Sequence, residues 1–327
     1  MLFSALADPG GRYGNRAWRI AVFGLIGAGL TALGFGIGGD AWGWLALAAF
    51  TVTLLAGLAA ALGTHRFVTA LLLNIWFLIA LALAFGFHHA AQNAGYILAG
   101  HITSYTWAQV LAWAGGSALW IAVTFLGWLI HGRQDRPPLA AELPGDTTVQ
   151  KLTGPMIIFA VIRAVVIGGT VVLAFGLNLS HGMWLPIAAM IAMKPSLEQS
   201  TLVAAQRLAG AVIGAAAAAL LLLIPASEHG LRLFAISRGL EVVVVVIIIL
   251  MHGFAIRFWN YALYCAAIAA GVLTLLDLPQ PSDYAAEGYR ILWTLCGVAI
   301  GVLVMLLAGL LARRTAKAPP HPAAQPA

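Results

Sequence analysis

Charged residues are scarce in this sequence: they make up 9% of its 327 residues, whereas hydrophobic residues make up 62%. An average soluble domain is about one quarter charged and about half apolar. A water-soluble fold could not hide so much apolar surface, so the composition excludes a soluble enzyme or binding domain. Alternating segments of about ten residues are also absent, which favours membrane-spanning helices over the strands of a β-barrel.

Residues for metal, redox or nucleotide chemistry are equally few. Cys265 and Cys296 lie within apolar segments and have no metal or redox spacing. The lysines, which are Lys151, Lys194 and Lys317, belong to no glycine-rich phosphate-binding loop. Paired metal-ligand histidines and a cluster of serine, histidine and carboxylate are also lacking. We therefore expect no metal, no cofactor and no enzymatic activity, ATP hydrolysis included.

Apolar segments recur along the whole chain. A helix rises 1.5 Å per residue, so about 20 apolar residues cross a hydrocarbon layer about 30 Å thick. The sequence predicts an all-α polytopic membrane protein with about ten transmembrane helices. The predicted spans are residues 17–38, 42–62, 67–87, 107–130, 155–177, 182–194, 203–225, 238–255, 258–277 and 289–312.

Lysine and arginine are shared unequally between the two sides of these spans. With the N-terminus inside, thirteen of the seventeen fall on the cytoplasmic side, three fall outside and Arg163 stays within a span. Because cytoplasmic loops are enriched in these residues, we expect a bacterial inner-membrane protein with both termini in the cytoplasm. This orientation also accounts for the net charge of +6, so nucleic acid is not an expected partner. The three outer residues are Arg232, Arg238 and Arg290.

A polar linker, residues 132–154, divides the chain into two transmembrane parts, residues 1–131 and 155–312. Residues 313–327 are rich in proline and alanine and are expected to be a disordered cytoplasmic tail. Matching residues in the two parts predict two parallel repeats, with four helices in the first and six in the second. The matched pairs are Arg19 with Arg207, Arg66 with Arg257, and Trp113 with Trp293.

Arg163 lies about eight residues into the apolar span 155–177. A charge at that depth is costly unless it faces a cavity or a partner, so it indicates a functional site. The alternative is that its long side chain reaches back to the cytoplasmic interface. The sequence leaves both interpretations open.

The predicted span 182–194 is unusually short, with room for a helix of only about 18 Å. Pro186 and Pro195 bracket the working part of this span, and each proline removes a backbone donor and disfavours helix just before it. Transporters often use a broken half-helix beside a cavity to aim backbone dipoles at a ligand. A short, tilted span with a proline kink is the alternative.

Small residues recur at four-residue spacing on two of the later spans. Gly210 and Gly214 form such a face on one span, and Gly297 and Gly301 form another on the last span. Because glycine lets two helix backbones approach closely, these faces predict tight helix packing.

Three ionisable residues, Glu241, His252 and Asp277, lie near the ends of spans. A carboxylate or histidine that faces a cavity could couple proton movement to transport. Each could equally be an interfacial residue.

Four segments of the second part carry a resemblance to a known family. They are the block HGMWLPIAAMIAMKP from His181, the helix from Arg207, the Asn260–Tyr261 span and the Arg290–Gly301 span. Together they resemble the fusaric acid resistance protein family, most clearly over residues 155–312. That family includes exporters of aromatic carboxylic acids, is related to plant malate channels and has two six-helix repeats. The resemblance implies that two helices which would precede Arg19 are lacking here.

The leading functional hypothesis is a secondary exporter of small aromatic or other hydrophobic organic anions, driven by the proton gradient. The arginines would hold a carboxylate, and Trp184 would stack on an aromatic ring. The candidate substrate-binding residues are Arg163, His181, Trp184, Lys194 and Arg207.

Two other functions remain open at this point, a passive organic-anion channel and a non-transporting membrane subunit or envelope factor. A passive channel needs a pore lined by the same basic residues, but it needs no residue that couples transport to protons. The second is favoured by the missing two helices. Besides the substrate and membrane lipid, the candidate partners are a second copy of the chain and a periplasmic adaptor.

Overall fold

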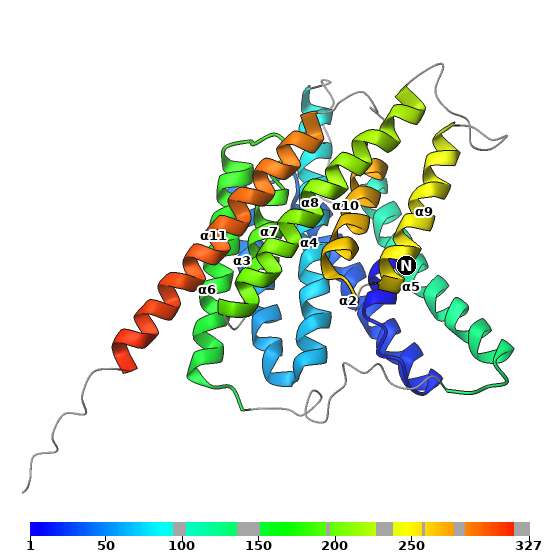
Figure 1. Ribbon diagram of the computed structural model, residues 1–327, viewed down its shortest axis with the longest axis horizontal. Helices are drawn as coiled ribbons and strands as arrows, with labels where there is room; N and C mark the ends of the chain where they lie inside the picture. The colour runs from blue at the N-terminus through cyan, green and yellow to red at the C-terminus, as the bar shows by residue number, and fades with distance from the viewer. Residues whose placement is uncertain are drawn as a thin grey trace, which may run out of the picture. The chain divides into compact units, whose positions relative to one another are not determined.

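The computed structural model describes residues 1–93, 103–135, 151–193, 197–226, 238–256, 259–277 and 285–316. These residues form α-helices joined by turns, with no strand among them (Figure 1). Ala59–Leu62 extends α3 as a 3-10 turn, and Val172–Gly176 extends α6 as a π turn. The helices are α1 Leu2–Leu6, α2 Tyr13–Ile37, α3 Trp42–Leu58, α4 Thr64–Asn93, α5 Ser104–Ile130, α6 Gly154–Val171, α7 Trp184–Ala192, α8 Leu197–Ala226, α9 Arg238–Ile256, α10 Tyr261–Asp277 and α11 Ala285–Ala316.

Within the described residues, six helical segments are long and apolar enough to cross a membrane. Shorter apolar helices cover Ala209–Leu222, Gly239–Gly253 and Tyr261–Leu275. Each of the ten segments expected from the sequence overlaps a helix, so the all-helical membrane architecture is confirmed. That all ten cross the membrane stays a prediction. The six long segments are Tyr13–Ile37, Trp42–Leu62, His65–His89, Ser104–Ile130, Gly154–Gly176 and Gly288–Leu310.

The chain divides into two compact units, Met1–Leu179 and Ser180–Ala327, and each is described by itself. In the first, the N-terminal unit, α2 packs on α4 and α5, and α3 packs on α4 and α6. Trp76 of α4 and Trp113 of α5 stack with ring centroids 4.6 Å apart. The Trp113 Nε1–H also donates to the carbonyl of Gly24 in α2, over 3.0 Å, which satisfies the buried indole.

The short helix α1 precedes the first span expected from the sequence, which begins at residue 17. It packs on α5, where the hydroxyls of Ser4 and Ser117 lie 3.0 Å apart and are buried. In the turn that follows α1, the carboxylate of Asp8 pairs with Arg16 in α2. Two serines and an ion pair therefore hold this polar stretch against apolar helices.

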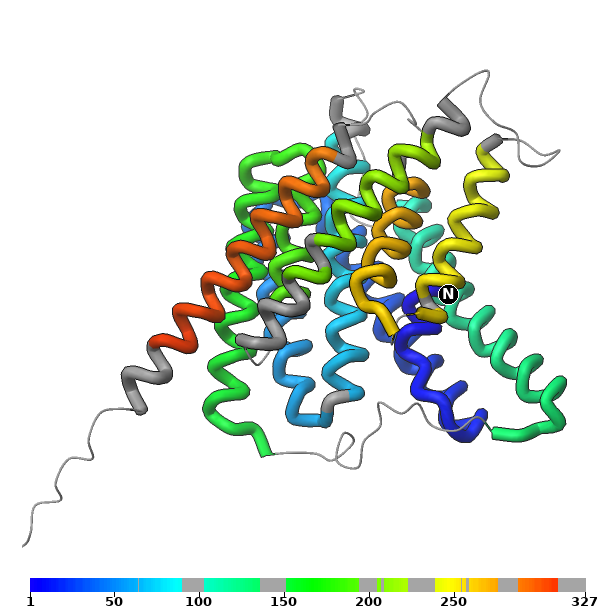
Figure 2. Tube along the Cα trace, viewed as in Figure 1, coloured from blue at the N-terminus to red at the C-terminus, as the bar shows by residue number. Residues whose placement is uncertain are grey.

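In the second, the C-terminal unit, α8 packs on α10 and α11, α9 packs on α10, and α7 packs on α11 (Figure 2). Glycines lie at the two tightest crossings. A Cβ on Gly210 would lie 2.9 Å from the carbonyl oxygen of Ala262, and one on Gly214 would lie 2.7 Å from that of Ala266. On α11, a Cβ on Gly301 would lie 3.0 Å from the Ala189 oxygen. The close packing predicted for both glycine faces is thus observed.

The same helix pairs recur in the two units. The contacts α2–α4, α2–α5 and α3–α4 of the first correspond to α8–α10, α8–α11 and α9–α10 of the second. In addition, α1 packs on α5 as α7 packs on α11. The two units therefore share this order of contacts, with a short helix in front of each set of four. That they are two parallel repeats stays a prediction, as do the repeat boundaries.

The short helix α7 has nine residues, and all of them are buried. Pro186 is its third residue, in the first turn, where the missing N–H has no acceptor within the helix in any case. Pro186 therefore starts the helix rather than kinking it. The helix ends at Ala192, and Met193 is already extended. The kink proposed for Pro186 is not observed, and the segment is a short enclosed helix.

Candidate functional site

The strongest candidate site lies in the C-terminal unit, where the chain enters α7 beside the first turns of α11. We call it the aromatic–arginine cluster. His181 has a left-handed backbone, with φ of 55°, and turns the chain into α7. The cluster consists of His181 and Trp184 from this turn and α7, and of Tyr289, Arg290 and Trp293 from α11.

Arg290 and Trp184 form the buried part of the cluster. The guanidinium carbon of Arg290 lies 3.9 Å from the centroid of the Trp184 ring, and the two residues are each 5% exposed. The indole face carries partial negative charge, so it stabilises a cation that burial would otherwise disfavour. The result is a positive charge held against an aromatic surface in an apolar setting.

Two further contacts join the same two segments. The rings of His181 and Tyr289 stack with centroids 5.8 Å apart and planes 13° from parallel. The Trp293 Nε1–H donates to the carbonyl of Ser180 over 2.8 Å. His181 and Tyr289 are exposed beside the buried pair. The cluster thus places a cation and aromatic faces together, the groups that bind an aromatic carboxylate.

Arg163 lies in α6 of the N-terminal unit and is 1% exposed. Its guanidinium carbon lies 5.4 Å from the centroid of the Phe67 ring of α4. An arginine that reaches the interface keeps its head in water, whereas this side chain is enclosed. Since Arg163 and Trp184 belong to separately described units, they are not assigned to a common site.

The structure does not describe the side chains of the other predicted basic residues. Lys194 lies outside the described residues, and Arg207 is a residue of α8 whose side chain is not described. The same holds for Asp277, the last residue of α10.

Glu241 and His252 lie far apart on α9. Glu241 is in the first turn and fully buried. His252 is exposed, and its Nδ1 lies 2.8 Å from the carbonyl oxygen of Ile248 in the same helix. Eleven residues separate them, about 16 Å along the axis. Glu241 is therefore the enclosed coupling candidate, whereas His252 has the geometry of a surface residue.

Arg290 and Tyr289 were missed as site residues. Arg290 was expected at the outer face, on loop charge alone. Trp184 and Arg290 are far apart in the sequence, and no local spacing connects them. The sequence feature that could have identified Arg290 is the Arg290–Gly301 segment, which carries part of the family resemblance. Within the described residues, no group of three or more His, Cys, Asp or Glu side chains gathers as a metal site would.

The family resemblance is confirmed by comparison with protein-family models. Residues 166–304 match the model described as fusaric acid resistance protein-like. Searches of curated proteins and of solved structures find no match. The matched range contains the whole aromatic–arginine cluster, together with α7 and both glycine crossings. Residues 166–304 of this multi-pass helical membrane protein are therefore a fusaric acid resistance protein-like region, as the motifs predicted.

Proposed function

We propose that this chain is a secondary transporter of the bacterial inner membrane that exports small organic anions, aromatic or otherwise hydrophobic carboxylates. The observation that carries the proposal is the buried Arg290 on the face of Trp184, within the range that matches the family. A buried cation on an aromatic surface suits a ligand that is itself a carboxylate joined to a ring.

In this proposal Arg290 forms charge-assisted hydrogen bonds to the carboxylate, and Trp184 offers its ring to the apolar part of the ligand. His181 and Tyr289 form the exposed approach to this pair. Arg163, Lys194 and Arg207, which the sequence also proposed, are kept as separate basic candidates. No step requires catalysis or a cofactor.

Proton coupling is assigned to Glu241 first. Glu241 is fully buried in an apolar helix, and an enclosed carboxylate of this kind is the usual carrier of a proton in transporters. Asp277 and His252 are the other candidates. A passive channel would need none of them, and a non-transporting subunit would need neither these residues nor Arg290.

The experiment compares Arg290→Ala and Arg290→Lys with the unmodified protein in inverted vesicles, using uptake of a labelled aromatic acid. Loss of charge-assisted pairing costs roughly 1.5 to 3 kcal/mol, so the alanine variant should lower apparent affinity about ten- to a hundredfold. Lysine should retain part of the affinity because it keeps the charge without the planar, bidentate geometry.

Arg66→Ala is the matched control, since Arg66 is an exposed arginine at the start of α4. It should transport like the unmodified protein. Protein amount is measured in every vesicle sample. Equal transport by all variants would remove Arg290 from the site and leave Arg163 as the enclosed basic candidate.

A further inference from the structure

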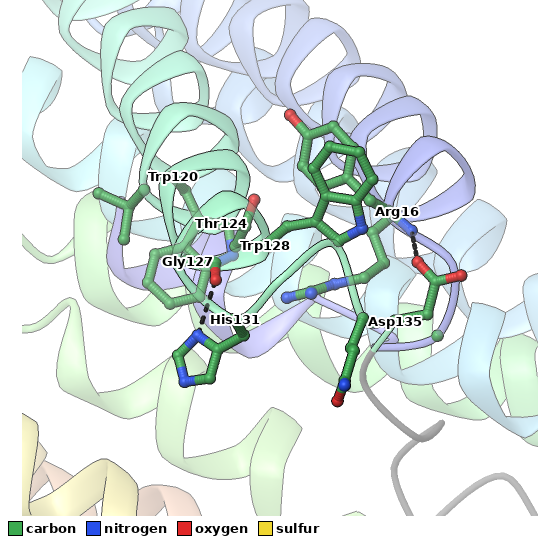
Figure 3. A pocket seen from close by; sticks show the side chains of 11 residues that line it. Arg16, Trp120, Thr124, Gly127, Trp128, His131 and Asp135 are labelled. Atoms are coloured by element: carbon green, nitrogen blue, oxygen red, sulfur yellow. Dashed lines mark hydrogen bonds between the residues drawn. The ribbon is translucent and has the colours of Figure 1, made fainter.

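A second site lies in the N-terminal unit, where α2 begins and α5 ends (Figure 3). It is a cavity of about 250 Å³. Its lining includes Arg16, Trp128, His131 and Asp135, and none of these residues belongs to the transport proposal. A water molecule accounts for about 30 Å³ of liquid, so the cavity has room for roughly eight heavy atoms.

Two side chains at the cavity present hydrogen-bond donors. Arg16 is 5% exposed, and its Nε and Nη2 donate to Asp8. The Nε1–H of Trp128 is buried without a hydrogen-bond partner among the described residues. A buried N–H without an acceptor costs about 1 to 3 kcal/mol. An oxygen-rich anionic group in the cavity would supply an acceptor for the Trp128 N–H and would lie beside the Arg16 guanidinium.

A carboxylate also lines the cavity, and it restricts the ligand. Asp135 accepts a hydrogen bond from the backbone N–H of Tyr13 over 3.1 Å through one oxygen, and the residue is exposed. A simple anion would be repelled by Asp135. A ligand that carries a cation a few bonds from its anionic group would satisfy Arg16, Trp128 and Asp135 together. The nearby Arg133, whose guanidinium carbon lies 5.9 Å from the Trp128 centroid, adds a further positive charge.

The setting of the cavity is that of a membrane interface. The helices that form it, α2 and α5, are both long enough to span a membrane. Tyr13 and Trp128 stack with centroids 5.6 Å apart, and such amphipathic rings favour the headgroup level. Next to the cavity, the last two turns of α5 expose Leu126, Leu129 and Ile130, whose exposed fractions are 57%, 40% and 72%. These side chains offer a surface for acyl chains.

We propose that this cavity binds the zwitterionic headgroup of a phosphoethanolamine lipid. The phosphate accepts hydrogen bonds from Arg16 and Trp128, and the ammonium group pairs with Asp135. The acyl chains lie along the exposed apolar face of α5. The phosphoethanolamine group fits the volume of the cavity, and its two opposite charges match the two kinds of side chain that line it.

The test measures lipid binding to the purified full-length protein in detergent by native mass spectrometry. Phosphatidylethanolamine and phosphatidylglycerol are compared at equal acyl composition, with soluble phosphoethanolamine as competitor. The unmodified protein should bind the ethanolamine lipid roughly tenfold more tightly than the glycerol lipid, the size of one charge-assisted contact. Soluble phosphoethanolamine should compete only weakly, because it lacks acyl chains.

Three variants make the test specific to this cavity. Asp135→Asn should abolish the preference for the ethanolamine lipid, and Trp128→Phe should weaken binding of both lipids severalfold. Trp107→Phe, at an exposed position near the start of α5, is the matched control and should change neither. Equal binding of the two lipids by the unmodified protein, or an unchanged preference in Asp135→Asn, would overturn the proposal. So would competition by soluble phosphoethanolamine at the concentrations at which the lipid binds.

Discussion

At the scale of single residues, Asp8 shows how a carboxylate is kept ionised against apolar helices. Burial by itself raises the pKa of Asp8, but hydrogen bonds from Arg16 and the Gly10 N–H, the charge of Arg16 and the Trp120 N–H outweigh it. The distances are 2.9 Å to Arg16 Nε, 2.9 Å to Gly10 N and 3.1 Å to Trp120 Nε1. The pKa of Asp8 therefore lies below its ordinary value of 3.8.

Asp8→Asn should lower the free energy of unfolding by about 2 kcal/mol at pH 7, because the buried Arg16 loses its counter-charge. Since folding lowers the pKa of Asp8, the contribution is present above pH 3.8 and is lost as the pH falls through the folded-state pKa. Thermal unfolding in detergent, measured at pH 7 and pH 3, should show a gap between the two proteins that narrows in acid. A gap of the same size at both pH values would contradict this account.

Single residues were predictable from the sequence where one position stands out within its own segment. Arg163 is a charged residue within an apolar segment, and this contrast is enough to single it out as a candidate functional residue. The pairing of Arg290 with Trp184 was not predictable, because it depends on how α11 crosses α7. The burial of Asp8 and Ser4 was not predictable either, because their partners Trp120 and Ser117 are supplied by α5, more than a hundred residues along the chain.

At the scale of helices, the glycine faces set how close two axes come. Gly210 and Gly214 lie where α8 meets the backbone of α10, so this contact leaves no room for a methyl group. Four-residue spacing of small residues is visible in the sequence, and it predicted the surface correctly. The partner helix was not predictable, because spacing describes one face only.

Gly214→Ala should destabilise the protein by about 1 to 3 kcal/mol, since the added Cβ meets backbone atoms that cannot move aside cheaply. Gly309→Ala on α11 is the matched control. A Cβ there meets nothing within 4 Å, and alanine is the better helix former, so stability should stay equal or rise slightly. The midpoint of thermal unfolding in one detergent distinguishes the two variants. Equal midpoints for Gly214→Ala and the unmodified protein would mean that α8 does not pack this closely.

At the scale of the whole molecule, the length of the apolar segments accounts for the long helices, and loop charge predicts their orientation in a membrane. The helices were predictable, because segment length and composition carry that signal locally. Which helices pack together was harder to predict. The polar linker lies between α5 and α6, yet α6 packs on α3 within the N-terminal unit. A linker marks a break in the sequence and does not determine which helices pack together.

Reporter fusions after Ala312 and within residues 132–154 should both report the cytoplasm, as the distribution of lysine and arginine predicts. A fusion within residues 278–284 should report the periplasm and serves as the control for the opposite side. A periplasmic signal at either of the first two positions would contradict the orientation.

The central claim is that the chain moves organic anions against their gradient at the expense of a proton gradient. The most direct measurement is uptake of a labelled aromatic acid into inverted vesicles that contain the purified protein, with an imposed pH difference. We predict accumulation above the equilibrium concentration, which a protonophore abolishes and which is reduced in Arg290→Ala. Uptake that stops at equilibrium would indicate a channel, and uptake no greater than in protein-free vesicles would contradict a transport function.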